Sequence, residues 1–280
     1  MSSNESFIDI VDNLIASGKV RLPVFNSTAA KIQKKIGKDE PNVGLIEKLI
    51  TSDQSLTAKV LSVSNSSFYK GLTQISTVRN AIVRLGINEV SNIVMRVAHE
   101  QNFKSKTPFV NDIMRELWRH SIGCAMAAHW LTKHCGLSGI AHETFFAGLL
   151  HDVGKLIILT VIDDLAQSGE IATKPSLSLI TESMNTLHTD RGYSLLTHWN
   201  LPEKYSNIAR DHHKEQFDPD NYLETIVRLA NLSCNKMGFG LKSDPEIVLT
   251  GTEESLALRL TDIDIAKLQI FIEDSNVLQL

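Results

Sequence analysis

The chain has 280 residues with a formal net charge of −4, and 42% of its residues are hydrophobic and 21% charged. These values are ordinary for a globular protein and allow one large domain or two smaller ones. The acidic balance argues against a general nucleic-acid-binding surface, which needs a basic face, although a local basic patch remains compatible with it. Three separate cysteines without a Cys-x-x-Cys pair (Cys124, Cys135 and Cys234) indicate reduced thiols in a cytoplasmic protein.

We expect neither a secretion signal nor a membrane span. The first six residues, MSSNES, are polar and include a glutamate, unlike a secretory signal. The most apolar stretch, from Phe145 to Ile162, contains His151, Asp152 and Lys155. Three ionisable groups near the middle of a bilayer would be too costly. The expectation is therefore a cytoplasmic protein that does not associate with membranes.

Helical periodicity dominates the first hundred residues. Apolar residues from Phe7 to Ile15 share one helical face, with Ser3 or Asn4 as the cap and Gly18 as the stop. Four more helices are predicted, from Asn26 to Gly37, from Asp53 to Val63, from Val78 to Gly86 and from Ile87 to Val97. No residue type in this half suggests chemistry, so residues 1–105 are predicted to form a packing or interaction lobe.

Residues 104–109 (KSKTPF) are polar, contain Pro108 and indicate a linker. Beyond it, helices are predicted at 111–134, 142–160, 176–198, 202–213 and 222–237, with one or two more within 252–275. No run alternates between apolar and polar residues for long enough to indicate a strand. The sequence therefore predicts an all-α protein of two helical lobes, residues 1–105 and 110–280.

Glu116 and His120 are four residues apart in a predicted helix, so their side chains share one face. This spacing suits two ligands of one ion or of two adjacent ions. An exposed Glu–His pair without a ligand would look the same. For this pair alone, that simpler interpretation is favoured.

The pair His151-Asp152 lies within what we predict to be one continuous apolar helix. Burying these groups without partners would be costly. A divalent metal removes that cost, because imidazole and carboxylate both coordinate such ions. A buried hydrogen bond that only fixes helix packing is the alternative, and the sequence weighs the two equally.

Three further histidines extend the pattern. His188 lies in a predicted helix, and His212 and His213 end the helix that begins at Pro202. Adjacent helical side chains diverge by about 100°, so one can face a site while the other reaches a second ion. A histidine at a helix C-terminus is also favourable without any ligand, and this alternative is strongest for His213. The remaining histidines are predicted to carry no chemistry: His99, His129, His134, His142 and His198.

This order of residues resembles the ligand order of the HD superfamily of helical, metal-dependent phosphohydrolases. The fuller set is similar to the HD-GYP branch, which hydrolyses cyclic dinucleotides at a two- or three-metal site. The resemblance implies metals that activate a bridging water and clamp phosphate oxygens, with Asp152 catalytic and Lys155 contacting phosphate. The implied metal ligands are Glu116, His120, His151, Asp152, His188, His212, His213 and Asn231.

Two departures from the HD-GYP pattern argue against an active enzyme. The last ligand of the family is an aspartate, but Asn231 stands there, and an amide oxygen is a weaker, uncharged ligand. Only 17 residues separate His213 from Asn231, and they contain no Gly-Tyr-Pro signature. The substrate-binding loop of HD-GYP enzymes is therefore missing.

The rest of the chain, roughly residues 20–240, is similar to HDOD domains. The motifs that carry this resemblance are Leu22–Val24, Asp53–Leu61, Asn65-Ser66 with Phe68-Tyr69, Ala81–Gly86, Trp118–Ser121, Ala147–Gly154, Trp199–Pro202 and His212-His213. The resemblance implies a non-enzymatic or weakly enzymatic output module of bacterial signalling. Such modules are often fused to receiver, GGDEF or EAL domains, none of which is recognisable here.

Two hypotheses of different classes follow. The favoured one is a bacterial signal-transduction protein that acts through a signalling protein partner or a nucleotide ligand. Its degenerate metal site would hold iron, manganese or zinc at partial occupancy, or no ion at all. The alternative is an active metal-dependent phosphohydrolase acting on a nucleotide or cyclic dinucleotide. In both cases we expect six residues to converge on one pocket: Glu116, His120, His151, Asp152, His188 and His212.

Overall fold

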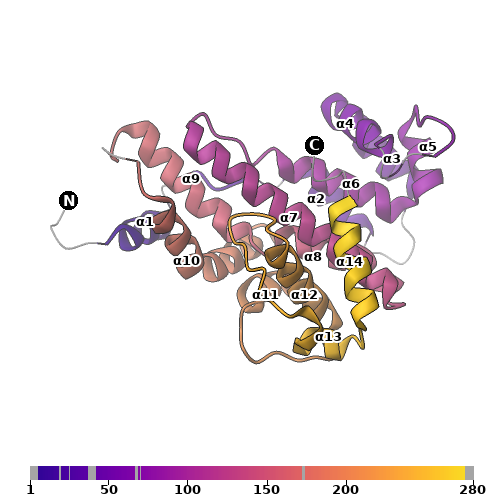
Figure 1. Cartoon of the computed structure of the whole chain (residues 1–280). Coiled ribbons are helices and arrows are strands. Elements are labelled where there is room, and N and C mark those ends of the chain that lie inside the picture. Colours follow the sequence, from indigo (N-terminus) through magenta and orange to yellow (C-terminus); the bar gives the residue numbers. More distant parts are fainter. Residues whose placement is uncertain are drawn as a thin grey trace.

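The computed structural model describes residues 6–18, 20–24, 26–36, 42–66, 69, 71–171 and 174–274. Every regular element in these ranges is a helix, which confirms the all-α prediction (Figure 1). The elements are α1 (Phe7–Ala16), α2 (Ser27–Ile36), α3 (Val43–Thr51), α4 (Gln54–Ser64), α5 (Val78–Leu85), α6 (Ile87–Glu100), α7 (Pro108–His134), η1 (Ser138–Ile140), α8 (Ala141–Leu150), α9 (Val153–Ser168), α10 (Leu177–His198), α11 (Glu203–Asp211), α12 (Tyr222–Lys236), η2 (Leu249–Gly251), α13 (Glu253–Ala257) and α14 (Asp262–Asp274).

The helices form two lobes, with α2–α6 in one and α7–α14 in the other (Figure 1). The 27-residue α7 is the axis of the second lobe and packs against α8, α9, α12 and α14. Helix α6 packs against α2, α4 and α5 and also against α8. One continuous apolar core therefore runs through both lobes.

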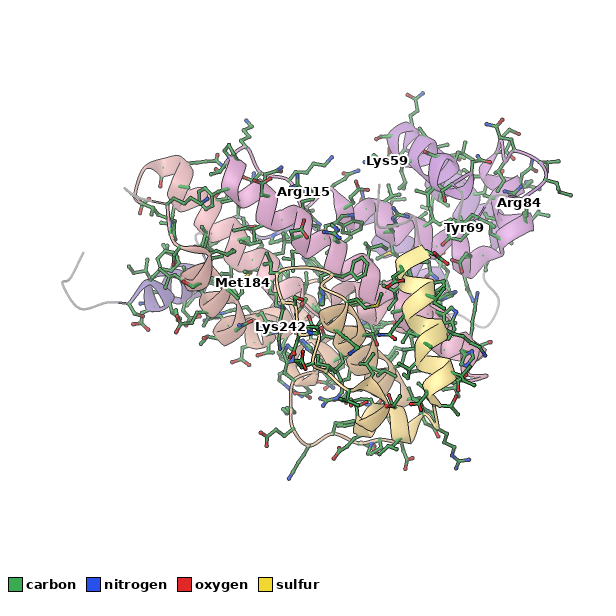
Figure 2. The ribbon with its side chains drawn as sticks, viewed as in Figure 1. Lys59, Tyr69, Arg84, Arg115, Met184 and Lys242 are labelled. Atoms are coloured by element: carbon green, nitrogen blue, oxygen red, sulfur yellow. The ribbon has the colours of Figure 1, made fainter. Side chains whose placement is uncertain are left out.

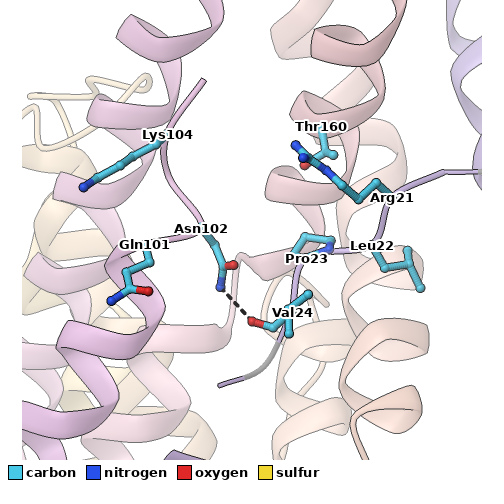
Figure 3. Close-up of a pocket in the computed structure, with 8 residues that line it drawn as sticks. All are labelled: Arg21, Leu22, Pro23, Val24, Gln101, Asn102, Lys104 and Thr160. Atoms are coloured by element: carbon cyan, nitrogen blue, oxygen red, sulfur yellow. Dashed lines mark hydrogen bonds between the residues drawn. The ribbon is translucent and has the colours of Figure 1, made fainter. Parts of the chain in front are cut away.

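The first helix lies outside the lobe to which its position in the chain would assign it. Helix α1 packs against α9 and α10 of the second lobe, and Arg191 on α10 forms an ion pair with Asp12 on α1. The segment after α1 then crosses back towards α2. Trp199 Nε1 donates to the Pro23 carbonyl at 3.2 Å, and Asn102 Nδ2 donates to the Val24 carbonyl at 3.2 Å (Figure 3).

Local capping accounts for most helix starts. Asp53 accepts a hydrogen bond from Leu56 N at 2.9 Å, as its predicted cap role requires, and Asn26 caps α2 in the same way. Helix α1 begins after Ser6, which forms a capping box with Asp9. The predicted caps Ser3 and Asn4 and the predicted stop Gly37 lie outside the described residues.

Two features of the helices differ from prediction. Helix α3 was missed, because its nine residues show too few turns for a clear period. The predicted helix 142–160 is two helices, and the turn between α8 and α9 falls at His151 and Asp152. Both helices are buried on almost every side, so the apolar pattern continues through the turn and hides it.

The stretch Ser138–Ser168 is long and apolar enough to cross a membrane by length and composition alone. In the structure, 94% of its most apolar window is buried inside the protein. Its side chains pack against α6, α7, α10 and α12, so its apolar character belongs to the core of the second lobe.

The buried histidine His99 predicts an acid-sensitive fold. Neither ring nitrogen has a hydrogen-bond partner among the described residues, and the ring packs against Phe103 and Trp118. Burial lowers the pKa of His99 to about 3. The unfolded chain therefore binds this proton more readily, and stability is lost as the pH falls below about 6.5 towards 3, by about 1.4 kcal/mol per pH unit.

We predict that His99→Phe reduces the loss of unfolding free energy with falling pH by about 1.4 kcal/mol per pH unit below pH 6.5. Urea unfolding between pH 7 and pH 4.5 measures the change. The exposed His198→Phe is the control and should leave the slope unchanged. Equal slopes for wild type and His99→Phe would contradict the prediction.

Candidate metal centre

Four imidazoles surround one buried carboxylate. The Oδ2 atom of Asp152 lies 3.4 Å from His120 Nε2 and 3.5 Å from His151 Nε2. The Oδ1 atom lies 3.4 Å from His188 Nε2 and 3.5 Å from His212 Nε2. The five residues are all buried, and Asp152 is only 1% exposed. Each carboxylate oxygen thus faces its own pair of histidines.

The cluster is assembled from four places in the second lobe. His120 comes from α7, His151 and Asp152 from the turn between α8 and α9, His188 from α10 and His212 from the end of α11. Glycine allows these elements to approach closely. A Cβ atom on Gly154 would lie 1.9 Å from the His188 carbonyl oxygen, so α9 and α10 touch through their backbones directly beside Asp152.

Each of the four imidazoles is fixed by a backbone carbonyl at its other nitrogen. The contacts are His120 Nδ1 with Phe239 O at 2.9 Å, His151 Nδ1 with Gly148 O at 2.8 Å, His188 Nδ1 with Met184 O at 2.8 Å and His212 Nδ1 with Ile208 O at 3.1 Å. A carbonyl only accepts, so Nδ1 carries the hydrogen in every ring. In a neutral ring, the lone pair of Nε2 then points towards the carboxylate. Metal-binding histidines usually have this arrangement, in which one ring nitrogen donates to a carbonyl and the other is free to bind the ion.

The protonation states of the cluster favour a cation between its members. Burial lowers the pKa values of His120 and His151, and it lowers that of His188 to about 4. Burial alone would raise the pKa of Asp152, but Lys155 and the histidines outweigh it and hold that pKa well below its usual range. At neutral pH, the neutral imidazoles of His120, His151 and His188 therefore face an ionised carboxylate, and their Nε2 atoms and its oxygens are acceptors.

Four of the ligand-type atoms in the cluster lack donors. Among the described residues, Asp152 Oδ1 and the Nε2 atoms of His151, His188 and His212 are buried without a hydrogen-bond partner. Nitrogen and oxygen ligands about 2.0–2.2 Å from a tetrahedral ion are about 3.3–3.5 Å apart, which matches the spacing around Asp152. The residues therefore fit a divalent metal, and because the two oxygens face different histidines, they offer two adjacent positions.

Lys155 supplies a positive charge at one of these positions. Its Nζ lies 2.5 Å from Asp152 Oδ2 and is partly exposed to the cavity above the cluster. That cavity has a volume of about 430 Å³, and Met184 and Lys242, labelled in Figure 2, are among the residues that line it. The other residues lining it include Asn185, His188, His213, Asn231 and Asn235.

Comparison with known proteins gives the family. A model of the HDOD domain matches residues 22–215, more than half of the chain. The chain belongs to the HDOD family. The match covers both lobes, from the segment before α2 to the turn after α11 that contains His212 and His213.

Crystal structures support the fold. An HDOD domain protein of unknown function from Geobacter sulfurreducens is 20% identical, with a TM-score of 0.75 over 97% of this chain and 95% of that one. A Shewanella amazonensis protein provisionally named a metal-dependent phosphohydrolase is 20% identical, with a TM-score of 0.67 over 95% and 97%. A Marinobacter aquaeolei protein provisionally named for signal transduction is 20% identical, with a TM-score of 0.68 over 99% and 66%.

An uncharacterised protein of Treponema pallidum is 25% identical over 218 residues. The matched region is 76% of this chain but only 42% of that protein. The chain thus spans less than half the length of this curated relative.

Glu116 is not part of the cluster around Asp152. Glu116 Oε2 lies 2.7 Å from Arg119 Nη1, and its side chain is partly exposed. Arg119 is one turn along the same face of α7, so it neutralises the carboxylate that the sequence analysis assigned to a metal. The expected convergence of six residues is therefore seen for five.

Two further predicted ligands lie at the edge of the cluster. The His213 ring is exposed and packs against His212, with ring centroids 4.0 Å apart, and both belong to a group of possible ligands with Asp152 and His188. Asn231 is buried, and its Oδ1 accepts a hydrogen bond from Asn235 Nδ2 at 3.1 Å. Its amide oxygen is thus partly engaged by its neighbour on α12.

Sequence reasoning missed two contributors to the site. Cys124 Sγ lies 3.5 Å from His120 Nε2, and its spacing of four from His120 in a predicted helix was an available signal. The second is the backbone at Phe239 and Gly240, which holds the His120 ring. Gly240 has φ +108, and a Cβ there would lie 2.8 Å from His120 Cβ. No sequence pattern indicated that this distant loop reaches α7.

We predict that Gly154→Ala disrupts the site and lowers the free energy of unfolding by about 3 kcal/mol or more, because the new methyl group would strike the α10 backbone. Thermal and urea unfolding measure the effect. Gly139→Ala is the matched control, since a Cβ there meets nothing within 4 Å. Equal stability of the two variants would contradict the close approach of α9 and α10.

Proposed function

We propose that this HDOD chain is a bacterial signalling protein that acts by binding, with a divalent metal held in a degenerate phosphohydrolase site around Asp152. One observation carries the proposal. Five buried acceptor groups converge with the spacing of metal ligands. Among the described residues, Asp152 Oδ1 and the Nε2 atoms of His151, His188 and His212 have no hydrogen-bond partner, and a cation would supply one. Imidazole suits iron, manganese or zinc. A cytoplasmic location, where such thiols and metals persist, is part of the same proposal.

Occupancy of the site is expected to be partial. Asn231 contributes no charge where the superfamily has a carboxylate, so Asp152 is the one carboxylate among the cluster residues described above. Lys155 already neutralises Asp152 and would compete with an ion for its Oδ2. Both features weaken metal binding relative to an active phosphohydrolase.

The ligand is proposed to be a nucleotide or, alternatively, a signalling protein. Support for the nucleotide comes from the cavity, whose volume of about 430 Å³ is within the range of small-molecule sites. Lys155 and Lys242 line it and suit phosphate, while the amides of Asn185 and Asn235 can hydrogen-bond to a base or sugar. A protein partner would instead bind the outside of the lobes and leave this cavity unchanged.

Active phosphohydrolysis is the second candidate, because His120, His151, Asp152, His188 and His212 are all present and converge. A bound divalent metal would supply Lewis-acid stabilisation of a phosphate. The residues of the chain would hold and orient the ion, and Lys155 would bind a phosphate oxygen. Binding without turnover is preferred, because the shortened segment before Asn231 lacks the groups that position a substrate, and positioning supplies much of the rate.

We predict no enzymatic turnover for the metal-loaded chain. Bis-p-nitrophenyl phosphate and a cyclic dinucleotide are incubated with full-length protein loaded with manganese, iron or zinc, and product is followed by absorbance and chromatography. Asp152→Asn, which removes the central carboxylate, gives the background. Multiple turnover at about 1 per second or faster, lost in Asp152→Asn, would establish the enzyme instead.

We predict that Asn231→Asp tightens metal binding by about tenfold or more, equivalent to ~1.4 kcal/mol, because a second carboxylate joins the ligands. Isothermal titration with manganese or zinc on tag-free protein measures the change. Asn235→Asp, one helical turn away and lining the same cavity, controls for charge alone and should give the smaller gain. If neither wild type nor Asn231→Asp binds an ion, the metal site is refuted.

A further inference from the structure

A thiol lies within the metal centre at a place where the phosphohydrolase pattern has no cysteine. Cys124 is fully buried on α7, one turn beyond His120. The ligand atoms of Cys124, His120 and His151 all lie within 4.8 Å of one another. The residue His151 is only 1% exposed, and its Nε2 belongs to this group. That atom has no hydrogen-bond partner among the described residues.

The spacing agrees with coordination. Nitrogen at about 2.0–2.1 Å and sulfur at about 2.3 Å from a tetrahedral ion are about 3.5 Å apart. Cys124 Sγ and His120 Nε2 are 3.5 Å apart. Asp152 Oδ2 lies at ligand spacing from the same two histidines. Cys124 Sγ and Asp152 Oδ2 therefore both lie at ligand spacing from His120 Nε2, and together with His151 they offer two nitrogens, one oxygen and one sulfur.

Charge gives an independent reason for a thiolate here. Asn231 is uncharged, and Asp152 directs its Oδ1 at the other histidine pair. A divalent ion beside His120 and His151 would therefore contact only one oxygen of the single carboxylate. A thiolate at Cys124 would supply the negative charge that Asn231 lacks. The simpler explanation, a small core residue whose thiol donates to His120 Nε2, accounts for the place of Cys124 but supplies no negative charge to the ion.

We infer that Cys124 is a metal ligand which, with His120, His151 and Asp152, forms a mixed nitrogen, oxygen and sulfur site for a thiophilic divalent ion such as zinc. The inference rests on the proposed metal function and names the ligand that makes it specific. When the sulfur–metal bond forms, the Cys124 thiol releases its proton to solvent. Thiolate and imidazole together favour zinc or iron over manganese or magnesium.

Cys234 on α12 is the neighbour of this sulfur. It is fully buried, and its thiol contact with Cys124 contributes, after burial, to raising the pKa of Cys124 well above its usual range. The raised pKa keeps the proton on Cys124 in the metal-free chain, so a thiolate would form there only as the ion binds. Cys234 is assigned a positioning role rather than a bond to the ion.

Cobalt(II) absorption tests the inference, because cobalt replaces zinc and a thiolate ligand adds a sulfur-to-cobalt charge-transfer band in the near ultraviolet. Full-length, tag-free protein is titrated with cobalt under a thiol-free reductant, which keeps Cys124 and Cys234 from forming a disulfide. Wild type should show the band, Cys124→Ser should lose it, and Cys135→Ser should keep it. Cys135 lies just past the end of the same helix and outside the cluster.

Zinc affinity gives the second readout. Loss of a direct ligand in Cys124→Ser should weaken zinc binding by more than the roughly 10- to 100-fold typical of second-shell changes, whereas Cys234→Ser should stay within that range. X-ray absorption of zinc-loaded wild type should find one sulfur at about 2.3 Å. This last measurement needs no variant, so a failure of Cys124→Ser to fold would not affect it.

The outcomes separate the two proposals. Cobalt or zinc bound by wild type without a sulfur ligand would overturn the assignment of Cys124 and leave the metal function standing. No binding of either ion by wild type would refute the metal function, and the inference with it.

Discussion

The second lobe depends on the burial of one charge. Asp152 is ionised in the interior, and an isolated buried carboxylate would be too costly to retain. The chain surrounds it with Lys155 and four imidazoles that are each fixed by a backbone carbonyl. This arrangement requires the turn between α8 and α9, which presents His151 and Asp152 together, and the glycine contact that brings α10 against α9.

The first lobe contacts α7 and α8 of the second lobe through polar groups as well as apolar packing, and α8 leads into the turn at His151 and Asp152. His142, at the start of α8, hydrogen-bonds to Asn92 on α6 and Gln33 on α2. His129 on α7 lies 3.3 Å from Glu89 on α6. Histidines that the sequence analysis considered without chemistry thus connect the lobes, and α8 runs from this contact to His151. Polar contacts and a shared apolar core thus join the two lobes at the helix that leads to the site.

Under the proposed function, the same cluster would keep the geometry of a metal site without strong turnover. Four carbonyl-fixed imidazoles around a carboxylate retain the geometry of a metal site. Asn231 and Lys155 reduce its net negative charge, which weakens the hold on a divalent ion. A binding role needs only that hold and the cavity above it, whereas catalysis also needs groups that position a substrate. The thiol of Cys124, which lies 3.5 Å from His120 Nε2, could restore negative charge as a thiolate.

The sequence by itself determined the helical class, most of the helix starts and five of the residues that converge, because periodicity, capping side chains and the His-Asp pair are local signals. It could not place the turn at His151 and Asp152, since two buried helices in succession give one unbroken apolar pattern. It could not separate Glu116, which Arg119 neutralises, from His120, because both share one face of α7. The contact of the Phe239 carbonyl with His120 was decided by the packing of the loop after α12 against α7, because contacts between residues more than a hundred positions apart leave no mark in a single sequence.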